Sequence, residues 1–161
     1  MRAFLSYSLN DAEQYVLTIL ARKLREQGFV ISLSYNVCSN TLNYETFNQI
    51  NKSNLFIGII TKTGNANRRV FNEWKEATKR RIPSLLLIED NVKVSPKLAE
   101  HPNVLFFNRQ KPKRAIETIK TRIAKTKQSI LVKKRDNDNT MAWVFGGLAA
   151  LAIIGLLAND E

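Results

Sequence analysis

The amino-acid sequence predicts a doubly wound α/β fold of the flavodoxin-like type, with a five-stranded parallel sheet and one C-terminal transmembrane helix. Three observations lead to this prediction. Short apolar runs alternate five times with amphipathic segments along the chain. The runs are apolar almost throughout, which is typical of parallel strands that helices cover on both faces. Near the C-terminus, residues 141–158 contain no charged side chain.

The predicted strands are short and rich in aliphatic and aromatic residues. They cover residues 3–7, 29–33, 54–60, 84–88 and 104–107. The run 54–60 is the most continuously apolar of the first three, as expected for a strand at the centre of a sheet.

The predicted helices follow the strands and carry apolar residues three or four positions apart. They cover residues 11–27, 44–51, 69–81, 95–100 and 113–133. Ser8 and Asp11 have the spacing of a capping box before the first helix, and Pro83 ends the third.

Residues 141–158 have the composition of a membrane-spanning helix. At 1.5 Å per residue such a helix extends about 27 Å, close to the ~30 Å hydrocarbon core of a bilayer. Basic residues precede it and an acidic tail, 159–161, follows, so the positive-inside tendency keeps the N-terminal part in the cytoplasm. We therefore expect a single-pass protein of the cell inner membrane, organised as a 1–127 domain, a 128–140 linker, the helix and the tail. A buried core helix is the alternative.

The formal charge of +11 is concentrated before this segment, since residues 109–135 carry 11 Lys and Arg against one acidic residue. Anionic lipids attract such stretches, so Lys133, Lys134 and Arg135 are expected to contact an anionic membrane. Nucleic acid is a less favoured partner, because no aromatic residue lies between Phe107 and residue 141 to stack on bases.

Cysteine and histidine each occur once, as Cys38 and His101. A single cysteine excludes an internal disulfide, and a single histidine argues against a histidine metal site or a Ser-His-Asp triad. No metal and no resident cofactor are expected.

In doubly wound sheets, ligands bind beyond the carboxyl ends of the strands, here the loops after Tyr7, Leu33 and Ile60. The turn at 6–10 has no glycine, which excludes a dinucleotide fingerprint and a P-loop. A phospho-accepting receiver domain needs an aspartate at the end of its third strand, and none stands there in this sequence. A flavodoxin-type binding site is not excluded by these residues, and none of them specifically supports it.

The remaining chemical candidate is Glu73. On a helical wheel, Val70, Trp74 and Ala77 form an apolar stripe that Glu73 borders. Glu76 instead faces Arg80 at i+4, the arrangement of a solvated ion pair. On geometry alone, a surface position is the more common role for a helical glutamate.

Two segments resemble motifs of Toll/interleukin-1 receptor (TIR) domains. Residues 2–8 (RAFLSYS) are similar to the first-strand signature, and residues 67–73 (NRRVFNE) resemble the start of the third helix, where enzymatic members carry an essential glutamate. The order of strands and helices agrees over about residues 1–127. Arg69 departs from the pattern, since tryptophan is common at that place, and the loop 35–43 lacks the usual Gly or Pro.

The resemblance implies cleavage of NAD⁺ at the nicotinamide–ribose bond, with NAD⁺ as substrate and Glu73 as the catalytic carboxylate. It also implies self-association with other TIR domains and a role in bacterial antiphage defence. Loss of nicotinamide develops positive charge on the ribose, which an anion at the ribose hydroxyls stabilises more than the ground state. Nicotinamide leaves as a neutral molecule, so no general acid is needed.

Ser6, Tyr7 and Ser8 in the first loop and Tyr35 in the second are candidates for holding the dinucleotide. Each has an alternative role that involves no ligand: Tyr7 packs in the core, Ser8 caps the first helix, and Tyr35 is solvated. Three functions stay open: a membrane-anchored NAD⁺ hydrolase or cyclase, a non-catalytic TIR adaptor that recruits partners to the cytoplasmic membrane face, and a nucleic-acid-binding domain.

Overall fold

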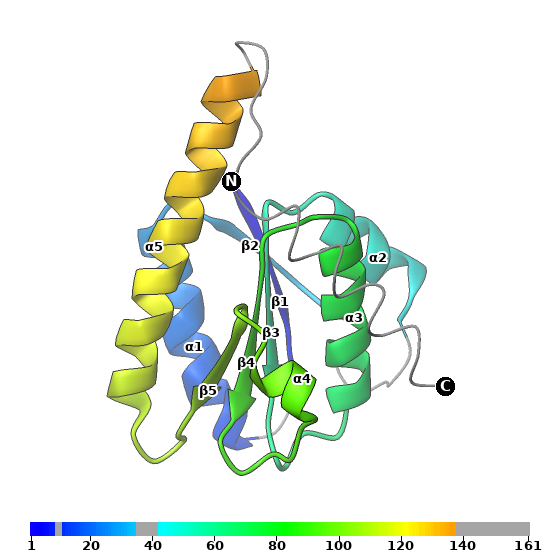
Figure 1. Ribbon diagram of the computed structural model, residues 1–161, viewed down its shortest axis with the longest axis vertical. Helices are drawn as coiled ribbons and strands as arrows, with labels where there is room; N and C mark the ends of the chain where they lie inside the picture. Colours follow the sequence, from blue (N-terminus) through cyan, green and yellow to red (C-terminus); the bar gives the residue numbers. More distant parts are fainter. Residues whose placement is uncertain (9–10, 35–41, 138–161) are drawn as a thin grey trace.

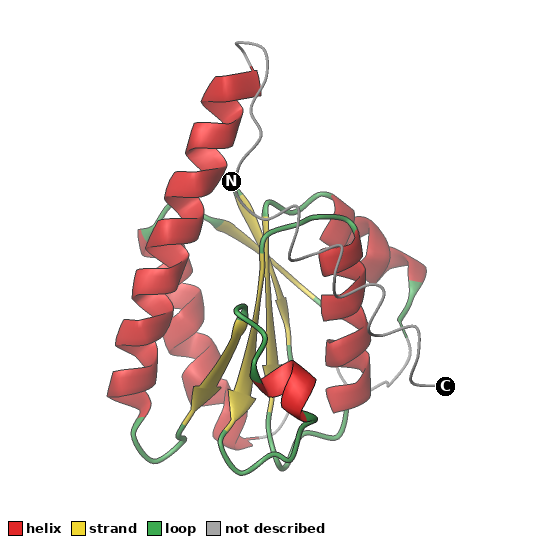
Figure 2. Ribbon diagram, viewed as in Figure 1, coloured by secondary structure: helices red, strands yellow, loops and turns green. Residues whose placement is uncertain are grey.

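A computed structural model describes residues 1–8, 11–34 and 42–137 of the chain (Figure 1). In this part, parallel strands form a single sheet with the order β2-β1-β3-β4-β5 (Figure 2). The strands are β1 (Arg2–Ser6), β2 (Val30–Leu33), β3 (Leu55–Ile60), β4 (Ser84–Glu89) and β5 (Val104–Phe107). From β1 the chain moves to one edge of the sheet, and from β3 to the other. The topological switch point, where such sheets bind ligands, therefore lies between β1 and β3.

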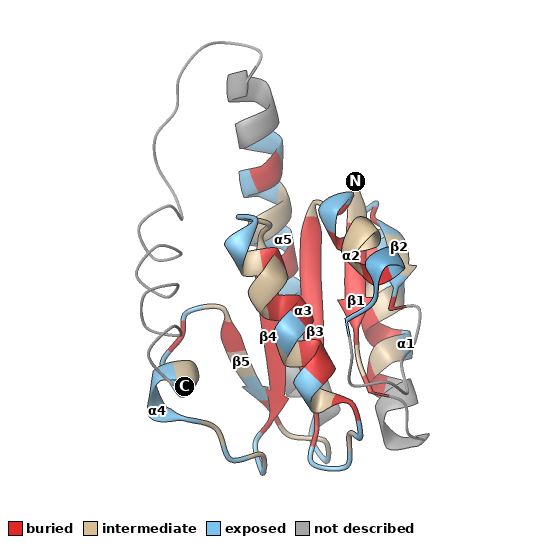
Figure 3. Ribbon diagram, turned by 90° about the vertical axis from the view of Figure 1, so that its right-hand side faces the viewer, coloured by how far each residue is buried: buried red, intermediate tan, exposed pale blue. Residues whose placement is uncertain are grey.

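Helices cover both faces of the sheet. On one face lie α1 (Asp11–Glu26) and α5 (Pro112–Asn137), and on the other lie α2 (Tyr44–Asn51), α3 (Asn67–Lys79) and the short α4 (Pro96–Ala99) (Figure 1). Strand residues alternate between the two resulting cores, so Leu5 packs under α1 and α5 whereas Phe4 packs under α3. Both central strands, β3 and β4, are buried at every position (Figure 3).

Gly58 in β3 allows α3 to approach the sheet closely. A Cβ atom at this position would lie 3.1 Å from Cγ1 of Val70 on α3 and 2.9 Å from Cδ1 of Leu86 on β4. Such distances are shorter than ordinary van der Waals contact, so a larger residue would displace the side chains of Leu86 and Val70. The close contact therefore sets how near the side chains of α3 stand to the strand ends.

The strands and helices lie close to where the sequence predicts them. The third helix lies two residues earlier than predicted, at Asn67–Lys79 rather than 69–81, and α5 continues to Asn137 rather than residue 133. Periodicity locates the middle of a helix better than its ends. Lys133, Lys134 and Arg135 belong to the last turns of α5.

The structure corrects the predicted fold class in one part, the transmembrane helix. Among residues 1–8, 11–34 and 42–137, no helix is both long and apolar enough to cross a membrane. The longest, α5, has 26 residues, but lysine and arginine recur along it, and charged side chains are costly in a bilayer. The prediction of a single-pass inner-membrane protein is corrected with it. Residues 141–158, on which both predictions rested, lie outside the described residues.

Candidate functional site

The carboxyl ends of β1 and β2 each carry a buried serine. Ser6 is the last residue of β1, and Ser34 directly follows β2. The two strands run parallel and side by side, so their ends lie at the same edge of the sheet. Both serine hydroxyls donate hydrogen bonds to Oε2 of Glu73, over 3.0 Å in the case of Ser34.

Glu73 lies on the buried face of α3, beside the apolar residues Val70, Trp74 and Ala77. Its side chain is 0% exposed, which an isolated carboxylate does not tolerate. Besides the two serine hydroxyls on Oε2, it has the guanidinium of Arg69 as an ion-pair partner, with Nη1 2.7 Å from Oε1. The carboxylate is thus held between α3 and the ends of the first two strands. Glu76, three residues on, forms the more exposed pair with Arg80.

Arg69 connects this carboxylate to the first loop. Its Nη2 donates a 2.6 Å hydrogen bond to the backbone carbonyl of Tyr7, while its side chain is only 1% exposed. A fully buried arginine requires such partners, since the desolvated guanidinium keeps its charge. Arg69, Glu73, Ser6 and Ser34 therefore form one buried polar cluster, which we call the Glu73 cluster.

Ser8 fastens the start of α3 to the end of β1. Its hydroxyl accepts a 3.0 Å hydrogen bond from the backbone N–H of Ala66, the residue before α3, and lies 3.4 Å from Oδ1 of Asn67. Asn67 also donates to the carbonyl of Thr61 after β3 over 2.6 Å. Ser8 thus binds the β3–α3 loop, and the bonds across the switch point position the helix that carries Glu73.

The side chain of Tyr7 has no hydrogen bond to Glu73 among those described. It contacts the core under α1 and α5, as expected from strand alternation next to Ser6. Burial raises the pKa of the Tyr7 phenol above its ordinary value of 10.0, and the nearby Arg69 partly offsets this rise. The hydrogen bond that joins Tyr7 to the cluster runs from Arg69 to its backbone carbonyl oxygen. Tyr35 and Cys38 lie outside the described residues.

Sequence reasoning missed three residues that hold Glu73 in place: Ser34, Arg69 and Asn67. For Ser34 a signal was present, because it is a polar residue directly after an apolar strand, as Ser6 is at the end of β1. Arg69 stands four residues before Glu73, which puts both on one helix face. That order of charges is the weaker one on an exposed helix, so its burial depends on the tertiary contact with the Tyr7 carbonyl.

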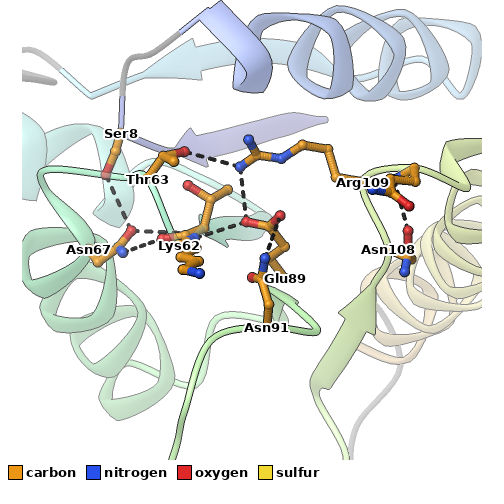
Figure 4. A network of polar contacts seen from close by, with 10 residues as sticks. Ser8, Lys62, Thr63, Asn67, Glu89, Asn91, Asn108 and Arg109 are labelled. Carbon is orange, nitrogen blue, oxygen red and sulfur yellow. Dashed lines mark hydrogen bonds and ion pairs between the residues drawn. The ribbon is translucent and has the colours of Figure 1, made fainter.

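A second polar cluster lies at the same edge of the sheet, over the ends of β3, β4 and β5 (Figure 4). At its centre is Glu89, the last residue of β4 and almost buried. Its Oε2 accepts 2.9 Å hydrogen bonds from the backbone N–H of Lys62 and from Nη2 of Arg109. The same Nη2 lies 3.1 Å from Oγ1 of Thr63. Within the described segments, no group of three or more His, Cys, Asp or Glu side chains is placed to hold a metal ion.

No family model matches the sequence, and no curated protein matches it. Among solved structures, the CMP N-glycosidase BcmB of Clostridium botulinum is similar, with a TM-score of 0.53, 18% identity, and coverage of 74% of this chain and 98% of that one. A 2-deoxyribosyltransferase from Bacillus psychrosaccharolyticus has a TM-score of 0.50, 13% identity, and coverage of 67% and 86%. For the TIR domains of the activated Roq1 resistosome, the TM-score is 0.46 at 14% identity, with 99% of each chain covered. The chain therefore shares the parallel α/β fold of the glycosidase and the transferase.

Proposed function

We propose that the chain cleaves the N-glycosidic bond of a nucleotide, with NAD⁺ as the substrate and Glu73 as the catalytic carboxylate. The observation that carries the proposal is the placement of one buried carboxylate where the carboxyl ends of β1 and β2 meet. This is the edge at which doubly wound sheets bind ligands. The names of two proteins with this fold, a CMP N-glycosidase and a 2-deoxyribosyltransferase, describe chemistry at the same class of bond.

In the proposed reaction, the bond between C1′ of the ribose and the nicotinamide nitrogen breaks. The bonding electrons go to nicotinamide, which leaves as a neutral molecule, while positive charge develops on C1′ and the ring oxygen. Glu73 stabilises this cation electrostatically through Oε2, the oxygen that the two serines hold, in a site shielded from water. A water molecule then adds to C1′ and loses a proton, which yields ADP-ribose.

Ser6 and Ser34 have a defined part in this proposal. In the free protein their hydroxyls donate to Oε2 of Glu73 and keep the buried carboxylate hydrogen-bonded. Ribose hydroxyls are donors of the same kind, so a bound substrate replaces one serine at Oε2 and brings its C1′ close to the negative charge. Arg69 stays paired with Oε1 and keeps the carboxylate in its orientation.

The test is release of nicotinamide from NAD⁺ by the full chain. It is measured over a range of protein concentrations, because the resemblance to TIR domains implies that activity follows self-association. We expect Glu73→Gln, which keeps the side-chain volume, to lower the rate by at least about 100-fold. Glu76→Gln is the matched control on the same helix and should leave the rate unchanged. Equal rates for the wild type and Glu73→Gln would falsify the assignment.

A second candidate is a non-catalytic adaptor that binds other TIR domains. One observation favours it: the Glu73 carboxylate already has partners on both oxygens, which suits a purely structural ion pair. Under this hypothesis the wild type releases no nicotinamide at any concentration, yet Glu73→Gln still destabilises the fold. Denaturation and turnover together therefore separate the two candidates.

A further inference from the structure

Arg109 is held in a fixed position at the carboxyl edge of the sheet, although it lies in a loop. It follows β5, and its side chain reaches back over the ends of β4 and β3 (Figure 4). Both of its contacts use one nitrogen, Nη2, which is 2.9 Å from Glu89 Oε2 and 3.1 Å from Thr63 Oγ1. Glu89 is itself held by the Lys62 backbone N–H and by Asn91 Nδ2, so the anchor of the guanidinium is rigid.

Two nitrogens of this guanidinium, Nε and Nη1, are available to a ligand. Guanidinium carries five N–H donors, and Arg109 uses only those of Nη2. Within the described part of the chain, Nε and Nη1 have no partner, and the side chain is 28% exposed. An arginine that is fixed through Nη2, with the donors of Nε and Nη1 left over, can donate charge-assisted hydrogen bonds from these nitrogens to a phosphate.

The local charge also favours an anion. Lys62 and Lys111 are exposed near Arg109, and together these three cations outnumber the two acids, Glu89 and Asp90. Both acids are already bonded, Glu89 to Arg109 and Asp90 to Asn108 Nδ2 over 2.7 Å. The first turn of α5, which starts at Pro112, contains no acidic residue, so the positive end of the helix dipole adds to the same field.

The Glu89–Arg109 cluster and the Glu73 cluster are close enough for a single ligand to contact both. Glu89 ends β4 and Ser6 ends β1, and only β3 separates these strands. Neighbouring strands are about 4.8 Å apart, so the two clusters stand roughly 10 Å apart along the sheet edge. The bonds of Asn67 to Thr61 and of the Lys62 N–H to Glu89 connect them through the β3 loop.

We propose that Arg109, anchored by Glu89 and Thr63, binds a phosphate group of the substrate whose glycosidic bond lies at Glu73. The inference rests on the proposed function and narrows its substrate class: the chain acts on phosphorylated nucleotides and discriminates against nucleosides. Arg109 binds the substrate but takes no part in bond cleavage. Its removal therefore raises KM for a phosphorylated substrate and leaves kcat nearly unchanged.

The first test measures binding of inorganic pyrophosphate to the full chain by isothermal titration calorimetry. We expect Arg109→Gln to weaken binding about tenfold or more, and Arg109→Lys to weaken it less, because lysine keeps the positive charge. Arg80→Gln is the matched control, since it also removes an arginine from an Arg–Glu pair, at the C-cap of α3. Undetectable binding by the wild type, or equal affinities for the wild type and Arg109→Gln, overturns the inference.

The second test compares NAD⁺ with nicotinamide riboside, which has the same glycosidic bond and no phosphate. We expect Arg109→Gln to lower kcat/KM for NAD⁺ about tenfold and to leave the riboside unaffected. Equal losses for both substrates contradict a phosphate contact. If no substrate is cleaved, the proposed function fails, but pyrophosphate binding still decides the role of Arg109. Melting temperatures of the variants establish that each is folded.

Discussion

At the scale of single residues, breaking the Arg69–Glu73 pair has a large consequence for stability, because both side chains are almost without solvent exposure. Two desolvated charges that compensate each other add little net stability relative to apolar residues of the same size. Removing one of them, however, leaves the other buried without the opposite charge that compensates it. The pair is therefore a requirement of the fold whether or not it is catalytic.

We predict that Glu73→Ala lowers the free energy of unfolding by about 3–5 kcal/mol, because the buried Arg69 guanidinium loses its carboxylate partner. Glu73→Gln should cost less, since the amide oxygen still accepts hydrogen bonds from Ser6, Ser34 or Arg69. Glu76→Ala, which breaks a more exposed pair, should cost about 0–1 kcal/mol. Urea denaturation measures all three, and similar losses for Glu73→Ala and Glu76→Ala would contradict the buried placement.

His101 gives the fold a pH dependence of its own. The ring is buried edge-on against Trp74, with centroids 5.1 Å apart, and its Nδ1 accepts a 3.0 Å hydrogen bond from the Asn103 N–H. Burial lowers the pKa of His101 below its ordinary value of 6.5. In the window below 6.5 the unfolded chain thus binds a proton that the folded chain does not.

Stability should therefore fall as the pH drops through this window, and the fall should be smaller in a His101→Asn variant. Asparagine keeps an acceptor for the Asn103 N–H but does not titrate. The measurement is the free energy of unfolding of both proteins at about pH 7.5 and about pH 5.5. Carboxylates titrate alike in the two proteins, so their contribution cancels in the comparison. Parallel pH profiles would show that His101 is already solvated and free to protonate.

At the scale of elements, the contact between α3 and β3 decides where the Glu73 cluster lies. Ser8 and Asn67 hold the start of α3 at the strand ends, and Gly58 allows its middle to approach the sheet. The N-cap residue Ala66 has no side-chain capping bond, so the hydroxyl of Ser8 supplies from another element what a cap would supply locally. The position of α3 on the sheet thus determines the geometry of the Glu73 cluster.

We predict that Gly58→Ala destabilises the fold by about 1–3 kcal/mol, because the added methyl overlaps Leu86 and Val70. A second substitution, Leu86→Ala, opens space on one side of the new methyl group. The double variant should then lose less stability than the sum of the two single losses. Chemical denaturation of the four proteins gives this coupling energy, and strict additivity would mean that α3 moves away instead.

At the scale of the whole molecule, the parallel sheet was predictable because each strand is a short, continuous apolar run. β3 and β4 are buried at every position. Their sequences, LFIGII and SLLLIE, are apolar almost throughout, and this is enough to predict such burial. The polar clusters were less accessible to sequence reasoning. Glu73 bordered an apolar stripe, but its partners Ser6 and Ser34 come from strands 67 and 39 residues away. Arg109 and Glu89 likewise meet only because β4 and β5 are neighbours.

The net charge of +11 makes association of whole molecules dependent on salt. Copies of a strongly basic chain repel one another, and the range of this repulsion shortens from about 30 Å at 0.01 M salt to about 10 Å at 0.1 M. We predict that self-association, followed by sedimentation velocity, increases as sodium chloride is raised over this range. Pyrophosphate binding at Arg109 should weaken over the same range, because salt screens that attraction. The two trends therefore run in opposite directions, and association that falls with salt would indicate contacts between unlike charges at the interface.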